Sequence, residues 1–164
     1  ESPLPVVGAA QGLSLAGGLE LMLSCDVIIA AKTARFGDQH AQYGLLPGWG
    51  GSQRLPRLVG LRRAMDLFFS ARWIDAEVAQ SWGLINRIVE DAALHAEAMQ
   101  YCVALTERSR PGLAAMKRLA RNGTEMALPA GLRLEVECVV DGILSDDASE
   151  GLAAFEARRK PSFG

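Results

Sequence analysis

The sequence predicts an α/β fold with a mostly helical second half. A short apolar run at residues 6–10 is followed by a glycine-rich turn, a helical stretch and a second apolar run at residues 27–30. A strand, a helix and a strand in this order favour a right-handed crossover between parallel neighbours. Residues 61–159 then carry a series of helical patterns. With 164 residues, the chain has the length of one ordinary domain.

The composition excludes several classes of protein. Hydrophobic residues make up 49% of the chain, which is more than a disordered tail contains. The formal net charge of −2 lacks the basic excess of nucleic-acid binders, so we expect no nucleic-acid partner. Three widely spaced cysteines without a C-x-x-C pair predict neither a disulfide framework nor a metal site. No apolar run reaches the ~18 residues of a membrane span.

The first half is expected to alternate short strands with short helices. Residues 6–10 are apolar on both faces and are bounded by Pro5 and Gly12, as in a buried strand. The other expected elements, in chain order, are a helix over residues 17–24, a buried strand over 27–30, a short strand over 35–37 and a helix over 52–58.

In the second half of the chain, residues that typically begin or end helices indicate where the helices lie. Asp75 suits an N-cap, Gly83 a C-terminal stop, Pro111 the first turn of a helix, and Ser149 the N-cap of the last helix. The remaining expected elements are a helix over residues 61–71, a strand over 84–89, a helix over 91–108 and a helix around 132–143. We assign residues 1–89 to the α/β core and residues 90–164 to a helical region of the same domain.

One apolar stripe in the helical region has two possible roles. Leu132, Val136, Val139 and Ile143 recur at the spacing of one helix face. The stripe could form a subunit interface, or it could cover the sheet of its own chain.

The most informative stretch is residues 11–20, with the sequence QGLSLAGGLE. Its glycines let the backbone approach a ligand, and the N-terminus of the following helix offers unpaired N–H groups. Gly17 could therefore help to form an oxyanion hole, with Glu20 as an acid or base one turn later. Alternatively, Glu20 is a first-turn carboxylate stabilised only by the helix dipole.

Two other interpretations of this stretch are weaker. A phosphate loop needs G-K-[ST] or G-x-G-x-x-G, and neither is present. A nucleophile elbow needs G-x-S-x-G, and the sequence around Ser14 ends in Ala16 instead. A serine hydrolase that uses Ser14, with a later Asp and His95, is therefore a remote alternative.

A second candidate stretch begins with FGDQH at residues 36–40. Histidine suits proton transfer because an imidazole titrates near neutral pH. His40 is one of only two histidines and follows an expected strand. It could serve in catalysis, or it could be an ordinary hydrogen-bonded loop residue.

These blocks together resemble the enoyl-CoA hydratase/isomerase (crotonase) family over essentially the whole chain. The matching segments are PVVGAAQG at residues 5–12, AGGLEL at 16–21, CD at 25–26, FG at 36–37, LPGWGGSQRL at 46–55, WGLI at 82–85 and EGLAAFEARRKPSF at 150–163. The resemblance implies a crotonase-like ββα spiral core, incomplete at its N-terminus, with a helical C-terminal region for oligomerisation.

The resemblance also assigns roles to individual residues. It implies that the Gly17 N–H is one of two oxyanion-hole donors, the other lying in an N-terminal block that this chain lacks. Glu20 matches the first catalytic glutamate, and His40 stands where hydratases have the second. The positions implied for substrate binding are Gly18, Gly48, Arg159 and Lys160.

The implied function is thioester enolate chemistry on an acyl-CoA substrate: hydration, dehydration or double-bond isomerisation. An alternative is a non-catalytic or altered acyl-CoA-binding member, because His40 replaces a glutamate. The resemblance implies no cofactor beyond the CoA carried by the substrate and a homotrimer or hexamer. We expect a cytoplasmic location. The chain is also expected to be the C-terminal portion of a longer domain, with part of the active site upstream of it.

Overall fold

The computed structural model describes residues 2–163, which divide into two compact units. One comprises residues 6–101, and the other comprises residues 2–5 together with 102–163. The first is a mixed α/β unit and the second is helical, in agreement with the predicted fold class. The assignment of both regions to one domain, with a boundary at residue 89, stays a prediction.

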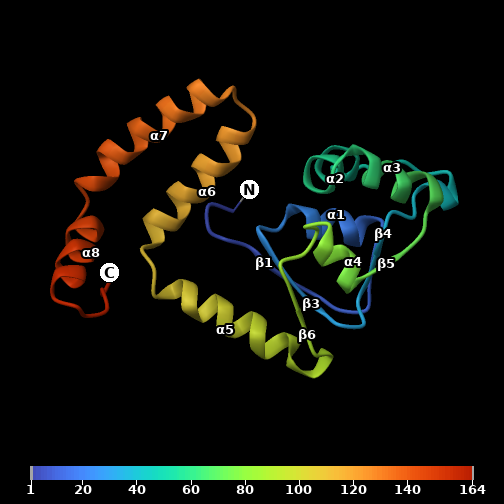
Figure 1. Cartoon of the computed structure of the whole chain (residues 1–164), viewed down its shortest axis with the longest axis horizontal. Helices are drawn as coiled ribbons and strands as arrows, with labels where there is room; N and C mark the ends of the chain where they lie inside the picture. The colour runs from blue at the N-terminus through green and yellow to red at the C-terminus, as the bar shows by residue number, and fades with distance from the viewer. Residues whose placement is uncertain (1, 164) are drawn as a thin grey trace. The chain divides into compact units, whose positions relative to one another are not determined.

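The α/β unit contains a parallel sheet in the order β1-β3-β6 (Figure 1). Its strands are β1 (Val7–Ala10), β3 (Val27–Ala31) and β6 (Arg87–Val89). The register pairs Val7 with Val27 and Ile29 with Arg87. The predicted parallel pairing of the first two apolar runs is thus confirmed. The strand expected over residues 84–89 is shorter than predicted, since only its last three residues pair.

A second sheet, in the order β2-β4-β5, supports the candidate site. It consists of β2 (Leu13–Leu15), β4 (Arg35–Gly37) and β5 (Ile74–Asp75). Phe36 in β4 pairs with Ser14 in β2 and with Ile74 in β5. We did not predict β2, because three residues are too few to show a strand periodicity.

Helices cover these sheets and complete the core. They are α1 (Gly17–Ser24), η1 (Ala41–Tyr43), α2 (Gly51–Val59), α3 (Leu61–Ser70) and α4 (Ala76–Ser81). The predicted cap of α4 is confirmed, since the Asp75 carboxylate accepts the Val78 N–H at 2.8 Å. The largest fully buried apolar side chains are Phe36, Leu19, Ile29, Leu55 and Leu67.

Four longer helices follow. After η2 (Asp91–Ala93) they are α5 (Leu94–Thr106), α6 (Arg110–Thr124), α7 (Leu128–Ile143) and α8 (Asp146–Glu156). The predicted cap of α8 is wrong: Ser145, not Ser149, accepts the Ala148 N–H at 3.2 Å. Ser145 immediately precedes two first-turn aspartates, which suit the positive end of the helix. Within residues 2–163, no helix is long and apolar enough to cross a membrane.

The apolar stripe of α7 is exposed. Its exposed fractions are 51% for Leu132, 63% for Val136, 53% for Val139 and 62% for Ile143. α7 packs against α6 within the helical unit (Figure 1). Within the helical unit these four side chains are therefore not covered by α6 or α8, and both possible roles of the stripe stay predictions.

Candidate active site

The N-terminus of α1 forms on a strained backbone. Ala16, the residue before the helix, has φ 48° and ψ −117°, outside the regions that residues with a side chain favour. Its N–H donates to the Gly37 carbonyl at 3.2 Å, and its carbonyl accepts the Glu20 N–H at 3.0 Å. Strain of this kind costs on the order of 1–3 kcal/mol and clusters at functional sites. The end of β4 thus fixes the point at which α1 begins.

Gly17 and Gly18 carry the first amide groups of α1. Because the first N–H groups of a helix have no acceptor within it, they can bind an oxygen that carries negative charge. A Cβ on Gly17 would lie 3.0 Å from Cζ3 of Trp49, whereas one on Gly18 would meet nothing within 4 Å. Glycine at position 17 therefore lets the indole ring lie directly against the helix terminus.

Glu20 lies one turn into α1, and only 2% of it is exposed. Its Oε1 accepts the backbone N–H groups of Trp49 and Gly51, each at 2.8 Å. Hydrogen bonds to a charged acceptor are about twice as strong as neutral ones. Gly50, between the two donors, has φ 104°, a conformation that glycine adopts readily. The carboxylate thus ties α1 to the loop that begins α2.

His40 lies beside the second oxygen of Glu20. Its Nε2 is 3.7 Å from Glu20 Oε2, which is longer than a hydrogen bond. Its Nδ1 is 3.0 Å from each carboxylate oxygen of Asp38. Only 8% of His40 and 1% of Asp38 are exposed. Glu20, His40 and Asp38 therefore form one buried cluster, the Glu20–His40–Asp38 cluster.

The structure brings together four of the predicted site residues. Glu20 and His40 face each other, Gly17 opens the helix that carries Glu20, and Gly48 immediately precedes Trp49. We did not predict a role for Asp38. The available signal was the Asp-x-His spacing, since an aspartate often accepts the N–H two residues later, as Asp38 Oδ1 accepts the His40 N–H at 3.0 Å.

This arrangement suits proton transfer beside a developing negative charge. Imidazole and carboxylate groups are the side chains that most often serve as general acids and bases. The amides at the start of α1 can stabilise charge on a carbonyl oxygen, and one such donor is typically worth about 10²–10³ in rate. The geometry therefore suits acid–base chemistry beside an oxygen that gains negative charge.

The position of Ser14 is wrong for a nucleophile elbow. That motif places the serine on the sharp turn between a strand and a helix. Ser14 lies instead within β2, paired with Phe36. The remote alternative, a serine hydrolase that uses Ser14, therefore has no support from this geometry.

Arg159 and Lys160 belong to the other unit, where each pairs with a carboxylate. Arg159 makes a two-point ion pair with Glu150, with N–O distances of 2.5 and 2.8 Å. The Lys160 ammonium lies 3.7 Å from Glu107 Oε2. The hydrogen bonds from Arg159 and from the Ser162 N–H lower the pKa of Glu150 to about 2. The ion pair thus holds the C-terminal segment to α8.

We expect the pair to persist to low pH. Because the pKa of Glu150 is lower in the folded state than its ordinary value of 4.5, its stabilising effect is full above pH 4.5 and disappears as the pH falls through about 2. A carbon NMR titration of the Glu150 carboxyl group should show this midpoint. Arg159→Gln should move the midpoint toward 4.5, whereas Lys160→Gln should leave it unchanged. An unchanged midpoint in Arg159→Gln would contradict the pairing.

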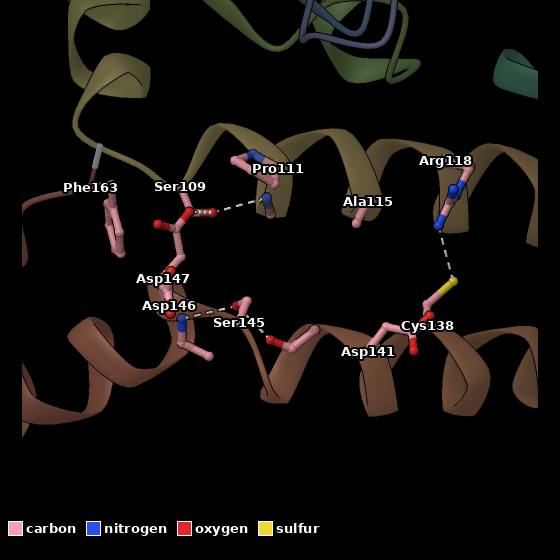
Figure 2. Close-up of a pocket in the computed structure, with 13 residues that line it drawn as sticks. Ser109, Pro111, Ala115, Arg118, Cys138, Asp141, Ser145, Asp146, Asp147 and Phe163 are labelled. Carbon is pink, nitrogen blue, oxygen red and sulfur yellow. Dashed lines mark hydrogen bonds between the residues drawn. The ribbon is translucent and has the colours of Figure 1, made fainter.

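The helical unit also contains a cavity of about 650 Å³ (Figure 2). Two pairs of its polar lining groups bind each other: Ser109 Oγ donates to Asp147 Oδ2 at 2.5 Å, and Arg118 Nη2 donates to Cys138 Sγ at 3.3 Å. No residue of the Glu20–His40–Asp38 cluster lines this cavity.

Comparison with known proteins gives one consistent family. The family model described as enoyl-CoA hydratase/isomerase matches residues 1–164. A "Probable enoyl-CoA hydratase" of Rhizobium meliloti (strain 1021) is 40% identical, over 97% of this chain and 62% of that protein. The human "Methylglutaconyl-CoA hydratase, mitochondrial" is 39% identical, over 98% of this chain and 49% of that protein.

Solved structures point to the same family. The enoyl-CoA hydratase of Bacillus anthracis has a TM-score of 0.95 and 35% identity, over 98% of this chain and 62% of that one. The chain thus spans about three fifths or less of these relatives. Its α/β core and C-terminal helices have the crotonase fold that the sequence predicted. The chain therefore belongs to the enoyl-CoA hydratase/isomerase family.

Proposed function

We propose that the protein acts on acyl-CoA thioesters through an enolate, as a hydratase, a dehydratase or a double-bond isomerase. One observation carries the proposal: Glu20 Oε2 and His40 Nε2 lie 3.7 Å apart, both buried, one turn from the first amides of α1. The proposal is supported by relatives that are named enoyl-CoA hydratase and methylglutaconyl-CoA hydratase.

In this function the Gly17 N–H donates to the thioester carbonyl oxygen. The resulting polarisation makes the α carbon acidic and a conjugated alkene electrophilic. Glu20 holds water or moves one proton, and His40 moves the other. Gly18 and Gly48 leave the backbone open for the acyl group. CoA enters as part of the substrate, and Arg159 and Lys160 are proposed to contact it.

His40 also supports a second candidate function. It occupies the position at which the resemblance places a second glutamate, and it is bound to Asp38. The protein would then bind acyl-CoA without turnover, or with an altered reaction.

A substrate panel tests both candidates. The full-length protein is assayed with conjugated enoyl-CoA, β,γ-enoyl-CoA and 3-hydroxyacyl-CoA thioesters of short, medium and long chains, with methylglutaconyl-CoA included. Turnover of any of them supports the enzyme. Calorimetric binding without turnover supports the second candidate, and neither binding nor turnover contradicts both.

We expect Gly51→Ala to lower kcat by moving Glu20. A Cβ at this position would lie 3.1 Å from Glu20 Cγ and Oε1, which is tighter than ordinary contact. Because misplacement of a reacting group by about 1 Å can cost about 10²-fold in rate, we expect the loss in kcat to be about 100-fold or less. Steady-state kinetics measure the loss. Gly123→Ala is the control, because a Cβ there would meet nothing within 4 Å. Equal activity of the two variants would contradict the expectation.

We further propose that the α7 stripe packs against a second copy of the chain, in a trimer or hexamer. Its four exposed apolar residues form one face of a helix of 16 residues. We expect Val136→Asp together with Ile143→Asp to lower the molar mass measured by light scattering. Glu137→Gln, on the same helix, should not. An unchanged molar mass in the double variant would contradict an interface at this stripe.

A further inference from the structure

Asp38 is a buried carboxylate that the proposed proton transfers do not use. It directly follows β4, and both of its oxygens are directed at His40. Oδ1 accepts the His40 backbone N–H at 3.0 Å, and both oxygens lie 3.0 Å from Nδ1 of the ring. Asp38 therefore restrains the backbone and the side chain of the same residue.

This contact favours one tautomer of a neutral His40 ring. An ionised carboxylate has only acceptors, so the nitrogen that faces it must carry the hydrogen. In a neutral imidazole the other nitrogen then has the lone pair. In that tautomer the Nδ1–H group is directed at Asp38, and the lone pair at Nε2 faces Glu20.

Glu20 presents a matching acceptor. Its Oε1 is occupied by the N–H groups of Trp49 and Gly51, so Oε2 is the oxygen that faces His40. In the Nδ1–H tautomer Oε2 and Nε2 are both acceptors, and they lie 3.7 Å apart, too far for a direct hydrogen bond. A molecule that satisfies both must donate two hydrogens, and water does so.

We propose that Asp38 is a positioning residue that holds His40 as the Nδ1–H tautomer, so that Nε2 accepts a proton from a water also held by Glu20. The inference rests on the proposed function and assigns hydration, rather than isomerisation, to this site. Asp38 also places a negative charge beside the imidazolium that forms, as the aspartate of a serine-protease triad does.

The hydration step balances within these groups. An O–H bond of the water breaks, and its proton goes to Nε2. The oxygen forms a bond to the β carbon, and the alkene electron pair moves into the thioester enolate. The Nε2–H of the imidazolium then gives its proton to the α carbon, which returns His40 to its neutral form. One water has been added, and no oxidant or reductant is needed.

The first test is Asp38→Asn. The asparagine oxygen can still accept the His40 N–H, but its NH₂ group would face Nδ1 and favour the Nε2–H tautomer. We expect kcat to fall by about 10²–10⁴-fold with little change in KM. Nitrogen NMR of histidine-labelled protein should show the hydrogen on Nδ1 in the wild type and on Nε2 in the variant. His95→Gln assigns the signals, since the chain has two histidines.

A double-mutant cycle separates positioning from a structural role. If Asp38 acts through His40, then Asp38→Asn should cost little more in a His40→Gln background. Equal losses in both backgrounds, or an unchanged tautomer in Asp38→Asn, would overturn the proposal. Circular dichroism checks the fold of each variant. Asp66→Asn is the control for lost charge, because Asp66 lies on α3 and pairs with Arg72.

The tautomer measurement and the substrate panel together distinguish failure of the proposed function from failure of the inference about Asp38. If the wild type turns over none of the thioesters, the proposed function fails, but the NMR result still shows whether Asp38 sets the tautomer of His40. If the wild type isomerises β,γ-enoyl-CoA and does not hydrate conjugated enoyl-CoA, the proposed function stands and the assignment to hydration is overturned.

Discussion

Glu20→Gln is expected to lower kcat by about 10²–10⁴-fold while leaving the fold intact. The glutamine oxygen can still accept the N–H groups of Trp49 and Gly51, so the loop before α2 keeps its place. The change falls on the second oxygen, where an NH₂ donor would face His40 in place of an acceptor. Steady-state kinetics on the substrate that the panel identifies measure the loss.

Glu77→Gln is the matched control. Both glutamates lie in the first turn of a helix, but Glu77 is exposed on α4. A carboxylate that served only the helix dipole would make the two variants equivalent. If Glu20→Gln retained kcat close to that of the wild type, Glu20 would neither hold the reacting water nor move a proton, and the dipole alternative would stand.

Phe36→Ala is expected to have the largest effect on stability. Phe36 is fully buried in β4, the central strand of the second sheet. Loss of a buried phenylalanine side chain costs about 3–5 kcal/mol, because apolar burial is lost and a cavity remains. Urea unfolding should show a lower midpoint with an unchanged slope.

Phe69→Ala provides the comparison within the same unit. Phe69 is 79% exposed on α3, so its removal should change the free energy of unfolding by no more than about 0.5 kcal/mol. A loss below about 1 kcal/mol in Phe36→Ala would contradict the packing described for β4. Because β4 leads directly into Asp38 and His40, the destabilised variant should also lose activity.

Parts of the fold with local signals were predictable from sequence. The α4 helix is set by Asp75 and Gly83, which act on the residues beside them, and the structure confirms both ends within a residue or two. β2 has no such signal, because it forms only by pairing with β4, some twenty residues later. The α8 cap was misplaced because two serines precede that helix's apolar residues and only the structure shows which one accepts an N–H.

The candidate site shows the same contrast between residues that have a local sequence signal and residues that are brought in by tertiary packing. Gly17, Glu20 and His40 come from motifs along the chain. Asp38 and the amide donors of Trp49 and Gly51 depend on how β4, α1 and the α2 loop meet in space. A motif can name the reacting groups, but the partners that orient them are set by tertiary packing.

The two carboxylate oxygens of Glu20 make different contacts, so a substitution at this position can change one contact and keep the other. One oxygen anchors a loop, while the other faces the cluster. A replacement that keeps the first acceptor in place can alter the chemistry without dismantling the scaffold. Position 20 is therefore a point at which a single substitution can change the reactivity. Glu20→Asp, by contrast, shortens the side chain and would withdraw both oxygens, the one that binds the Trp49 and Gly51 N–H groups and the one that faces His40.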